Sequence, residues 1–320
     1  MTEDLLFKIK EKSSEIDWAD TDIKKPLSIN FPVPVLHARY PKIQQYLLSV
    51  AQLSNYHFLE NDLIICDIEI KKHLTKNIAD LPNIIFLEAA ENKTKILSEA
   101  NILVKQVTGK NYKRILAIGG GIIANIASYI AEKLEVDIVH VPTTVLSMSD
   151  ASIGGKVRVN DIQGNTFIKH AYKTFYEPSE IVLDPLFLTY LSDEQIRIGL
   201  AEIIKHALYQ SPLLAEYLLS DAFQPFTDRL SLLRAILWVA DLKRICLEID
   251  PEETKNGSYK ILRAAHDISD KLEERSGFTL PHGKAVEKAM VEDLYSNKGK
   301  SEQLARIYQK LGIGYTTVFS

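Results

Sequence analysis

The chain of 320 residues is 46% hydrophobic and 25% charged, and its formal net charge is −4. This composition is typical of a globular protein, and the length allows two domains. The acidic balance, and the lack of any run of about 18 apolar residues, argue against a nucleic-acid-binding arm and a membrane span, so neither nucleic acid nor a membrane is an expected partner.

Cysteine usage and the N-terminus indicate the compartment. Cys66 and Cys246 lie far apart and form no metal-ligand pair, which fits a reducing environment without disulfides. The first 12 residues are charged and have no apolar core, so they do not resemble a signal peptide. We therefore expect a cytoplasmic protein.

Strand-like and helical segments alternate over residues 1–190. Helical patterns lie between several of the strands, as at residues 43–53 and 95–107. Such alternation predicts an α/β domain with a doubly wound, Rossmann-like parallel sheet. The predicted strands are residues 28–35, 63–66, 83–87, 115–118, 137–141 and 180–183.

A glycine loop follows the predicted strand at 115–118. Gly119, Gly120 and Gly121 allow a sharp turn, and the helical pattern at 122–134 begins directly after them. A helix N-terminus placed there suits a pyrophosphate, although the spacing is not G-x-G-x-x-G and a plain strand–helix turn is the alternative.

A second loop follows the predicted strand at 137–141. Thr143 and Thr144 come at its carboxyl end, where open α/β sheets bind ligands. Asp150 and Lys156 flank small residues that leave room for a ligand, and a lysine suits a phosphate or an oxyanion. A lone lysine is otherwise a solvated surface group.

After residue 190 the pattern becomes helical. A helix is predicted at 193–209 with Ser192 or Asp193 as its cap, and residues 251–257 read as a break between helices. The further predicted helices are 228–249, 259–275 and 284–297.

The helical half carries a candidate metal set. Glu202 and Lys205 share a helix face, His266 is predicted in mid-helix, and His282 is predicted at the start of the last long helix. One carboxylate and two imidazoles can hold a catalytic divalent metal and leave a position open. The alternatives are an exposed ion pair of Glu202 with Lys205 and two structural histidines.

Together these motifs resemble the dehydroquinate synthase-type sugar-phosphate cyclases, over about residues 93–298. The matching segments are 119–125, 142–144, 150–156, 176–178, 199–202 with Lys205, Lys243 with Asp250, His266, and His282 with Gly283. The resemblance implies an NAD-binding α/β domain over residues 1–190, an all-α metal- and substrate-binding domain over 191–320, and a homodimer.

The resemblance also implies a carbon–oxygen lyase reaction on a sugar phosphate. Hydride passes to NAD, phosphate is eliminated, hydride returns, and an aldol step closes a carbocycle. The implied metal ligands, for Zn²⁺ or else Co²⁺, are Glu202, His266 and His282. The implied catalytic residues are Asp150, Lys156, Lys205, Lys243, Arg263 and Asp270. The implied NAD contacts are Gly120, Gly121, Ile122, Asn125, Thr143, Thr144, Asp150, Lys156, Lys169 and Leu188.

Some positions depart from the family pattern. Tyr259 stands where an arginine binds the substrate carboxylate, Arg263 replaces an asparagine, and Asp270 replaces a second histidine. Asn125 replaces an acid, as in some cyclitol-forming members. Because these residues discriminate substrates, we expect a neutral sugar phosphate rather than the usual heptulosonate phosphate.

Two other functions stay open from the sequence. An NAD-dependent polyol dehydrogenase of the glycerol dehydrogenase type would share the glycine loop and the metal-bearing helical domain. A non-catalytic relative acting as a partner subunit would explain why the family's phosphate-binding arginine has no counterpart around residues 132–135. The intact set of Glu202, His266 and His282 argues against this alternative.

Overall fold

The computed structural model describes residues 3–33 and 45–314. The chain forms two compact units, one of residues 26–190 and one of residues 1–25 with 191–320. The first unit is an α/β structure and the second is helical. This bears out the predicted fold class.

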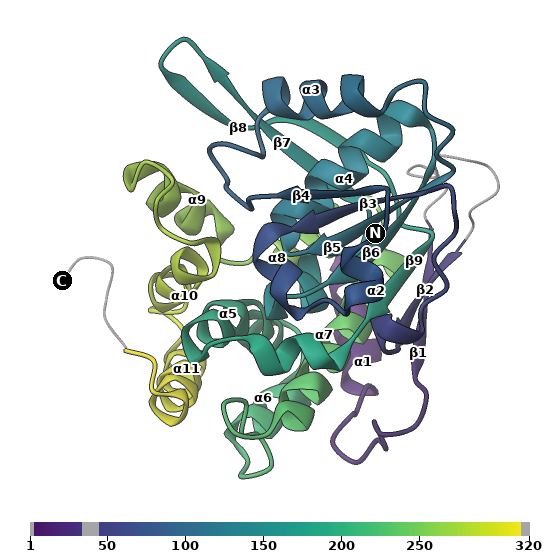
Figure 1. The fold of residues 1–320 in the computed structure, drawn as a ribbon. Coiled ribbons are helices and arrows are strands. Elements are labelled where there is room, and N and C mark those ends of the chain that lie inside the picture. Colours follow the sequence, from purple (N-terminus) through teal and green to yellow (C-terminus); the bar gives the residue numbers. More distant parts are fainter. Residues whose placement is uncertain (1–2, 34–44, 315–320) are drawn as a thin grey trace. The chain divides into compact units, whose positions relative to one another are not determined.

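The α/β unit is built on one mainly parallel sheet (Figure 1). Among the described residues the sheet has seven strands in the order β1-β2-β9-β6-β5-β3-β4, and only β1 runs antiparallel to its neighbour. Their bounds are β1 Ser28–Pro32, β2 Gln45–Val50, β3 Asp62–Asp67, β4 Ile84–Leu87, β5 Arg114–Gly119, β6 Asp137–Pro142 and β9 Glu180–Leu183.

Helices α3 (Leu97–Val107) and α4 (Gly121–Leu134) pack together against the sheet. Apolar side chains of β5, such as Ile115, meet Ile126 and Ile130 of α4 in a buried cluster. The apolar run predicted at 115–118 is therefore a strand with neighbours on both edges, as continuous hydrophobicity indicates. The shorter elements are α2 Lys76–Ala79, the 3₁₀ helices η1 Leu53–Asn55, η2 Ile68–His73 and η4 Pro185–Tyr190, and the π-helical turn η3 Ser147–Ala151.

The helix predicted at 43–53 is wrong, because residues Gln45–Val50 form β2. Tyr46 and Leu48 are buried while Gln45 and Leu47 are exposed, which is the two-residue period of a strand. β2 pairs with β1 on one edge and β9 on the other. A short apolar run is ambiguous in sequence, and here strand pairing decides it.

A long antiparallel hairpin of β7 (Lys156–Gln163) and β8 (Thr166–Phe175) was not predicted. It lies beside α3 and α4 (Figure 1), and β7 contacts both helices. Gly164 and Asn165 form the turn of this hairpin, and Gly164 has φ +60°.

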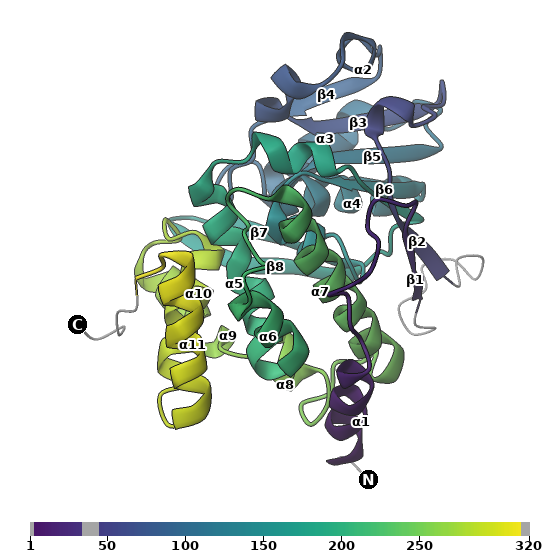
Figure 2. The ribbon, with the colours of Figure 1, turned by 90° about the horizontal axis from the view of Figure 1, so that it is seen from below.

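The helical unit consists of α1 and the helices after residue 190. α1 lies along α7 (Figure 2), and Ile9 is buried against Ile245, Cys246 and Ile261. Residues 1–25 therefore group with this unit and not with the α/β domain in which the sequence placed them. The bounds are α1 Glu3–Ser14, α5 Asp193–Tyr209, α6 Pro212–Leu219, α7 Arg229–Ile249, α8 Tyr259–Leu262, α9 His266–Arg275, α10 His282–Asp293 and α11 Lys298–Leu311.

Ser192 caps α5 in a capping box with Gln195, as one of the two predicted caps. The predicted helix at 259–275 is instead two helices, α8 and α9, separated by Ala265 at φ +61°. His266 is consequently the first residue of α9 and not a mid-helix residue. The helix predicted at 284–297 covers most of α10, and α11 was not predicted.

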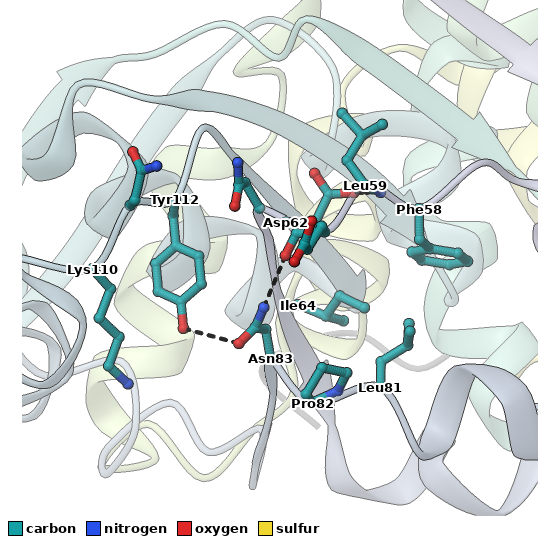
Figure 3. Close-up of a pocket in the computed structure, with 12 residues that line it drawn as sticks. Phe58, Leu59, Asp62, Ile64, Leu81, Pro82, Asn83, Lys110 and Tyr112 are labelled. Atoms are coloured by element: carbon teal, nitrogen blue, oxygen red, sulfur yellow. Dashed lines mark hydrogen bonds between the residues drawn. The ribbon is translucent and has the colours of Figure 1, made fainter.

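Within residues 3–33 and 45–314, the structure has no helix of the length and hydrophobicity that a bilayer crossing requires. A pocket of about 500 Å³ opens beside the amino ends of β3, β4 and β5, and Asn83 and Tyr112 are hydrogen-bonded at its wall (Figure 3). It is at the opposite end of these strands from Gly119, so it is not at the edge where open α/β sheets bind ligands.

Candidate metal centre and cofactor loop

Three side chains from three helices of the helical unit converge on one point. Glu202 in the middle of α5 is fully buried, and His266 and His282 begin α9 and α10. The Nε2 atoms of His266 and His282 lie 3.7 and 3.4 Å from the same oxygen of Glu202, Oε1. One ligand atom of each residue lies within 4.8 Å of the others, so the set can hold a single metal ion.

Gly283 lets α10 come close enough to complete this set. A Cβ added at Gly283 would lie 2.0 Å from the carbonyl oxygen of Ile198 on α5. Any larger residue would push α10 away from α5 and carry His282 with it, because His282 is the adjacent residue. Close packing of α10 on α5 therefore explains why a glycine follows His282.

Both imidazoles are oriented through their other ring nitrogen. His266 Nδ1 lies 3.0 Å from the carbonyl oxygen of Ala264, and His282 Nδ1 lies 2.8 Å from Oε1 of Glu273. An Nδ1–H donated to these acceptors leaves each Nε2 with its lone pair for a metal. Glu273 is buried on α9, two helical turns after His266. The sequence reading missed Glu273, although its spacing of seven residues from His266 was a usable signal.

The electrostatics of the cluster suit a cation. Burial alone would raise the pKa of Glu202, but Lys205 and the two imidazoles hold it well below its usual value. Burial and the Lys205 ammonium lower the pKa of His266 to about 3. Burial by itself would lower the pKa of His282. The Glu202 and Glu273 carboxylates outweigh the effect of burial and raise the pKa of His282 to about 9. At neutral pH Glu202 is thus charged and His266 neutral, as metal ligands require, whereas His282 is protonated and would have to release a proton from Nε2 to bind a metal.

Glu202 Oε1 supports the fit of a metal most directly. The oxygen is buried and accepts no well-formed hydrogen bond among the described residues, and the Nε2 atoms of His282 and His266 face it at 3.4 and 3.7 Å. A buried carboxylate oxygen without a hydrogen bond costs free energy of folding unless a ligand binds to it. The donor set of one carboxylate and two imidazoles fits Zn²⁺ or Co²⁺.

Lys205 and Lys243 are both buried in the helical unit. Lys205 Nζ pairs with Glu202 and donates to the carbonyl oxygen of Leu262 at 2.9 Å, so the exposed ion pair that was the alternative is ruled out. Lys243 is only 5% exposed on α7. Two buried ammonium groups are suited to binding ligand oxygens.

Arg263 and Asp270 form an ion pair with 2.7 Å between Nη2 and Oδ2. Arg263 follows α8, and Asp270 lies one turn beyond His266 on the same face of α9. The break at Ala265 produces this contact.

In the α/β unit the two predicted loops meet at the carboxyl ends of β5 and β6. The backbone N–H of Thr143 donates to the Gly119 carbonyl oxygen at 3.0 Å. A Cβ at Gly119 would lie 2.7 Å from Ile123, so only glycine permits the turn from β5 into α4. The structure therefore places the glycine loop and the threonine loop side by side.

Some of the remaining predicted NAD contacts lie beside the glycine loop, and others lie elsewhere in the α/β unit. Thr144 adjoins Gly120, and the turn η3, which contains Asp150, reaches Gly121 through Ala151. Ile122 lies in the first turn of α4 and Lys156 begins β7. Leu188 is fully buried in η4, and Lys169 lies in β8, where it acts on the carboxylate of Glu91.

Asn125 joins α4 to β7. Its Nδ2 donates to the Gly121 carbonyl oxygen at 2.7 Å, and its Oδ1 accepts from the Arg158 backbone N–H at 2.5 Å. The amide therefore organises the loop itself, and its direct contact with NAD stays a prediction.

Comparison with known proteins identifies the family. The model described as 3-dehydroquinate synthase N-terminal matches residues 84–198, and the one described as 3-dehydroquinate synthase C-terminal matches residues 199–312. The chain belongs to the 3-dehydroquinate synthase family. The 3-dehydroquinate synthase of Saccharolobus solfataricus is 33% identical over 248 residues, covering 73% of this chain and 69% of that protein. That of Sulfurisphaera tokodaii is 33% identical over 228 residues, covering 69% and 62%.

The chain spans only part of its curated relatives, down to 50% of the Sulfolobus acidocaldarius 3-dehydroquinate synthase. Solved structures share the fold of this family member at lower identity. A 2-epi-5-epi-valiolone synthase from Streptomyces hygroscopicus, with NAD⁺ and Zn²⁺ bound, has a TM-score of 0.73 at 21% identity, covering 89% of this chain and 85% of its own. A 2-deoxy-scyllo-inosose synthase with carbaglucose-6-phosphate, NAD⁺ and Co²⁺ has a TM-score of 0.67 at 19% identity, covering 89% and 81%.

Proposed function

We propose that this chain is an NAD- and divalent-metal-dependent sugar-phosphate cyclase that eliminates phosphate, a carbon–oxygen lyase. The observation that carries the proposal is the convergence of His266 and His282 on Glu202, with both Nδ1 atoms occupied by acceptors. The relatives named 3-dehydroquinate synthase and the two cyclases with bound NAD⁺ and metal support it.

Glu202, His266 and His282 would hold the metal, preferably Zn²⁺. When bound, the metal supplies a Lewis acid for a substrate oxygen, and NAD supplies a reversible hydride acceptor. The protein itself supplies orientation and protons. Lys205 Nζ pairs with Glu202 and is oriented by the Leu262 carbonyl oxygen, so it would be placed to donate to an oxygen of a bound substrate. Glu273 keeps a proton on His282 Nδ1 and thereby leaves Nε2 for the metal.

The glycine loop would bind the NAD pyrophosphate. The N-terminus of α4 follows Gly120, and its free N–H groups suit an anion. We further propose Thr143, Thr144, Asp150 and Lys156 as contacts of NAD or substrate and Lys243 as a ligand of substrate oxygens. Assembly as a homodimer stays a prediction.

We propose a neutral sugar phosphate as substrate. Tyr259 occupies the position where an arginine would recognise a substrate carboxylate, and a phenol cannot form that bidentate ion pair. Leaving a carboxylate without such a partner in a buried site would be costly. A hexose or heptulose phosphate avoids this cost.

The proposal is tested by incubating pure protein with NAD, Zn²⁺ and a panel of sugar phosphates that includes 3-deoxy-arabino-heptulosonate 7-phosphate. Phosphate and NADH are followed together. We expect phosphate release without accumulating NADH, loss of the reaction in His266→Ala, and no change in His57→Ala, which removes an exposed histidine. Accumulating NADH without phosphate release would instead identify a dehydrogenase. Formation of 3-dehydroquinate at a normal enzymatic rate would refute the substrate proposal alone.

A further inference from the structure

A buried chain of polar groups runs through the helical unit, from α1 to the helix that carries Glu202. At its centre is Gln210, the residue that ends α5, which is 3% exposed. The Gln210 amide contacts the Ser13 hydroxyl of α1, the Leu242 carbonyl oxygen of α7 and the ring of His206 on α5. Ser13 and His206 are fully buried. The chain thus links three helices around the C-terminal end of α5.

The hydrogen bonds of Gln210 fix which way round its amide lies. A carbonyl oxygen can only accept, so the atom that lies 2.8 Å from the Leu242 oxygen is the amide nitrogen Nε2. Nε2 also donates to Ser13 Oγ at 2.9 Å, and Ser13 donates in turn to the Ile9 carbonyl oxygen at 2.5 Å. The amide oxygen therefore faces His206 Nδ1 at 2.6 Å, and Nδ1 must carry a hydrogen and donate it.

Gln210 joins the two helices that carry predicted substrate-binding lysines. Lys205 lies on α5, and Lys243 lies on α7 directly after Leu242. Gln210 Nε2 is bonded to the α7 backbone at Leu242, and the sulfur of Cys246, one turn later on α7, lies 3.5 Å from the same nitrogen. Because a buried amide with both ends hydrogen-bonded is rigid, α5 and α7 cannot shift along one another without breaking these contacts.

His206 lies beside the metal ligand Glu202 on α5. The two residues are four apart in the sequence, so they share one face of the helix. A ring nitrogen of His206 lies within 4.8 Å of a Glu202 carboxylate oxygen, and both side chains are fully buried. The ring that Gln210 holds is therefore part of the wall against which the Glu202 carboxylate is placed.

We propose that Gln210 is a positioning residue of the metal centre, which sets the His206 ring beside Glu202, and that α1 completes this support through Ser13. The inference rests on the proposed cyclase function and adds the side chains that hold its metal ligand. It also gives the N-terminal helix a role, since residues 1–25 belong to the helical unit but lie outside the family match at 84–312. Without the Gln210 amide the His206 ring can turn, and Glu202 loses a fixed neighbour.

The competing explanation is that the chain only stabilises the packing of α1, α5 and α7. Metal binding by folded protein separates the two roles, because a purely structural contact changes the free energy of unfolding and not the geometry of the metal ligands. Zinc affinity is measured by competition with a chromophoric chelator. The visible absorption of Co²⁺-loaded protein reports the ligand geometry. Far-UV circular dichroism shows that each variant is folded, and urea unfolding measures its stability.

Two variants test the chain and two serve as controls. Gln210→Met keeps the length of the side chain and removes the amide, and Ser13→Ala removes the acceptor on α1. Gln309→Met is the matched control, since Gln309 is exposed on α11. Ser231→Ala is the control for stability alone, because it removes a buried hydroxyl that accepts from the Gln224 backbone N–H and donates to the Asp228 carbonyl oxygen at the start of α7.

We expect Gln210→Met to lower zinc affinity about tenfold or more and to shift the Co²⁺ absorption, because partners that hold a metal ligand in place tune metal binding. Ser13→Ala removes one hydrogen bond of the chain and should lower zinc affinity about threefold. Ser231→Ala should unfold at lower urea concentration and bind zinc like the unmodified protein. Gln309→Met should change neither property.

Unchanged zinc affinity and Co²⁺ absorption in folded Gln210→Met would overturn the proposal, even if that variant is less stable. Should Gln210→Met not fold, Ser13→Ala decides, and a zinc affinity equal to that of the unmodified protein would overturn the proposal. An unmodified protein that binds neither metal would refute the metal centre and this proposal together. Weaker zinc binding by Gln210→Met, with no phosphate released from any sugar phosphate, would refute the cyclase function and leave the positioning role standing.

Discussion

Oε1 of Glu273 accepts a hydrogen bond from His282 Nδ1 at 2.8 Å, and this contact turns His282 Nε2 toward Glu202. Glu273 lies on α9 with His266, while His282 begins α10. The Glu273 carboxylate thus links α9, which carries His266, to the position of the His282 ring. Such carboxylate–histidine contacts commonly tune metal affinity.

We expect Glu273→Gln to lower Zn²⁺ affinity about 10- to 100-fold, because a neutral amide is a weaker acceptor for the Nδ1–H of His282. Competition with a chromophoric chelator measures the effect. Glu274→Gln is the matched control, since Glu274 is the exposed neighbour on the same helix. Equal zinc affinities of the two variants would mean that Glu273 does not orient His282.

Ala265→Gly should stabilise the protein by about 1 kcal/mol. Ala265 has φ +61°, a left-handed conformation that is unfavourable for a residue with a Cβ. Urea unfolding measures the change in the free energy of unfolding. Ala264→Gly is the control, because Ala264 is not among the positive-φ residues of the described chain and should lose stability. A destabilised Ala265→Gly would show that the conformation carries no strain.

We expect buried His140 to make the protein less stable in acid. It is buried in β6, with Nδ1 3.0 Å from the Ser152 carbonyl oxygen and Nε2 2.9 Å from the Ser128 hydroxyl. Burial lowers its pKa from 6.5 to about 4, although the Ser152 carbonyl oxygen opposes the shift. Between these two values the unfolded chain binds a proton that the folded chain does not, so stability falls as the pH falls from about 6.5 to about 4.

The expected effect is a free energy of unfolding about 2 kcal/mol lower at pH 5 than at pH 7 from this group. Urea titrations at the two pH values measure it. His140→Gln removes the titrating ring, so its stability should change less between these pH values than that of the unmodified protein. The same pH dependence in both proteins would contradict the buried neutral state of His140.

Much of the fold could be predicted where local and tertiary preferences agree. The continuous apolar strand before Gly119 and the capped helix after Ser192 form as predicted. The helix predicted at 43–53 was wrong, because the strand pairing of residues 45–50 with residues distant in the sequence outweighs an ambiguous apolar pattern. The hairpin β7–β8 was missed for the same reason, since its packing on α3 and α4 is a tertiary contact.

The sequence by itself determined the chemistry that is available in this protein. It supplies a glycine loop after a buried strand and one carboxylate and two imidazoles in a helical half, and these residue types suit an anion and a divalent metal. Only the tertiary structure decided how these groups meet. The break at Ala265, the close approach at Gly283 and the carboxylate of Glu273 place two imidazoles on one oxygen of Glu202, because burial, helix packing and backbone conformation act between residues far apart in the chain.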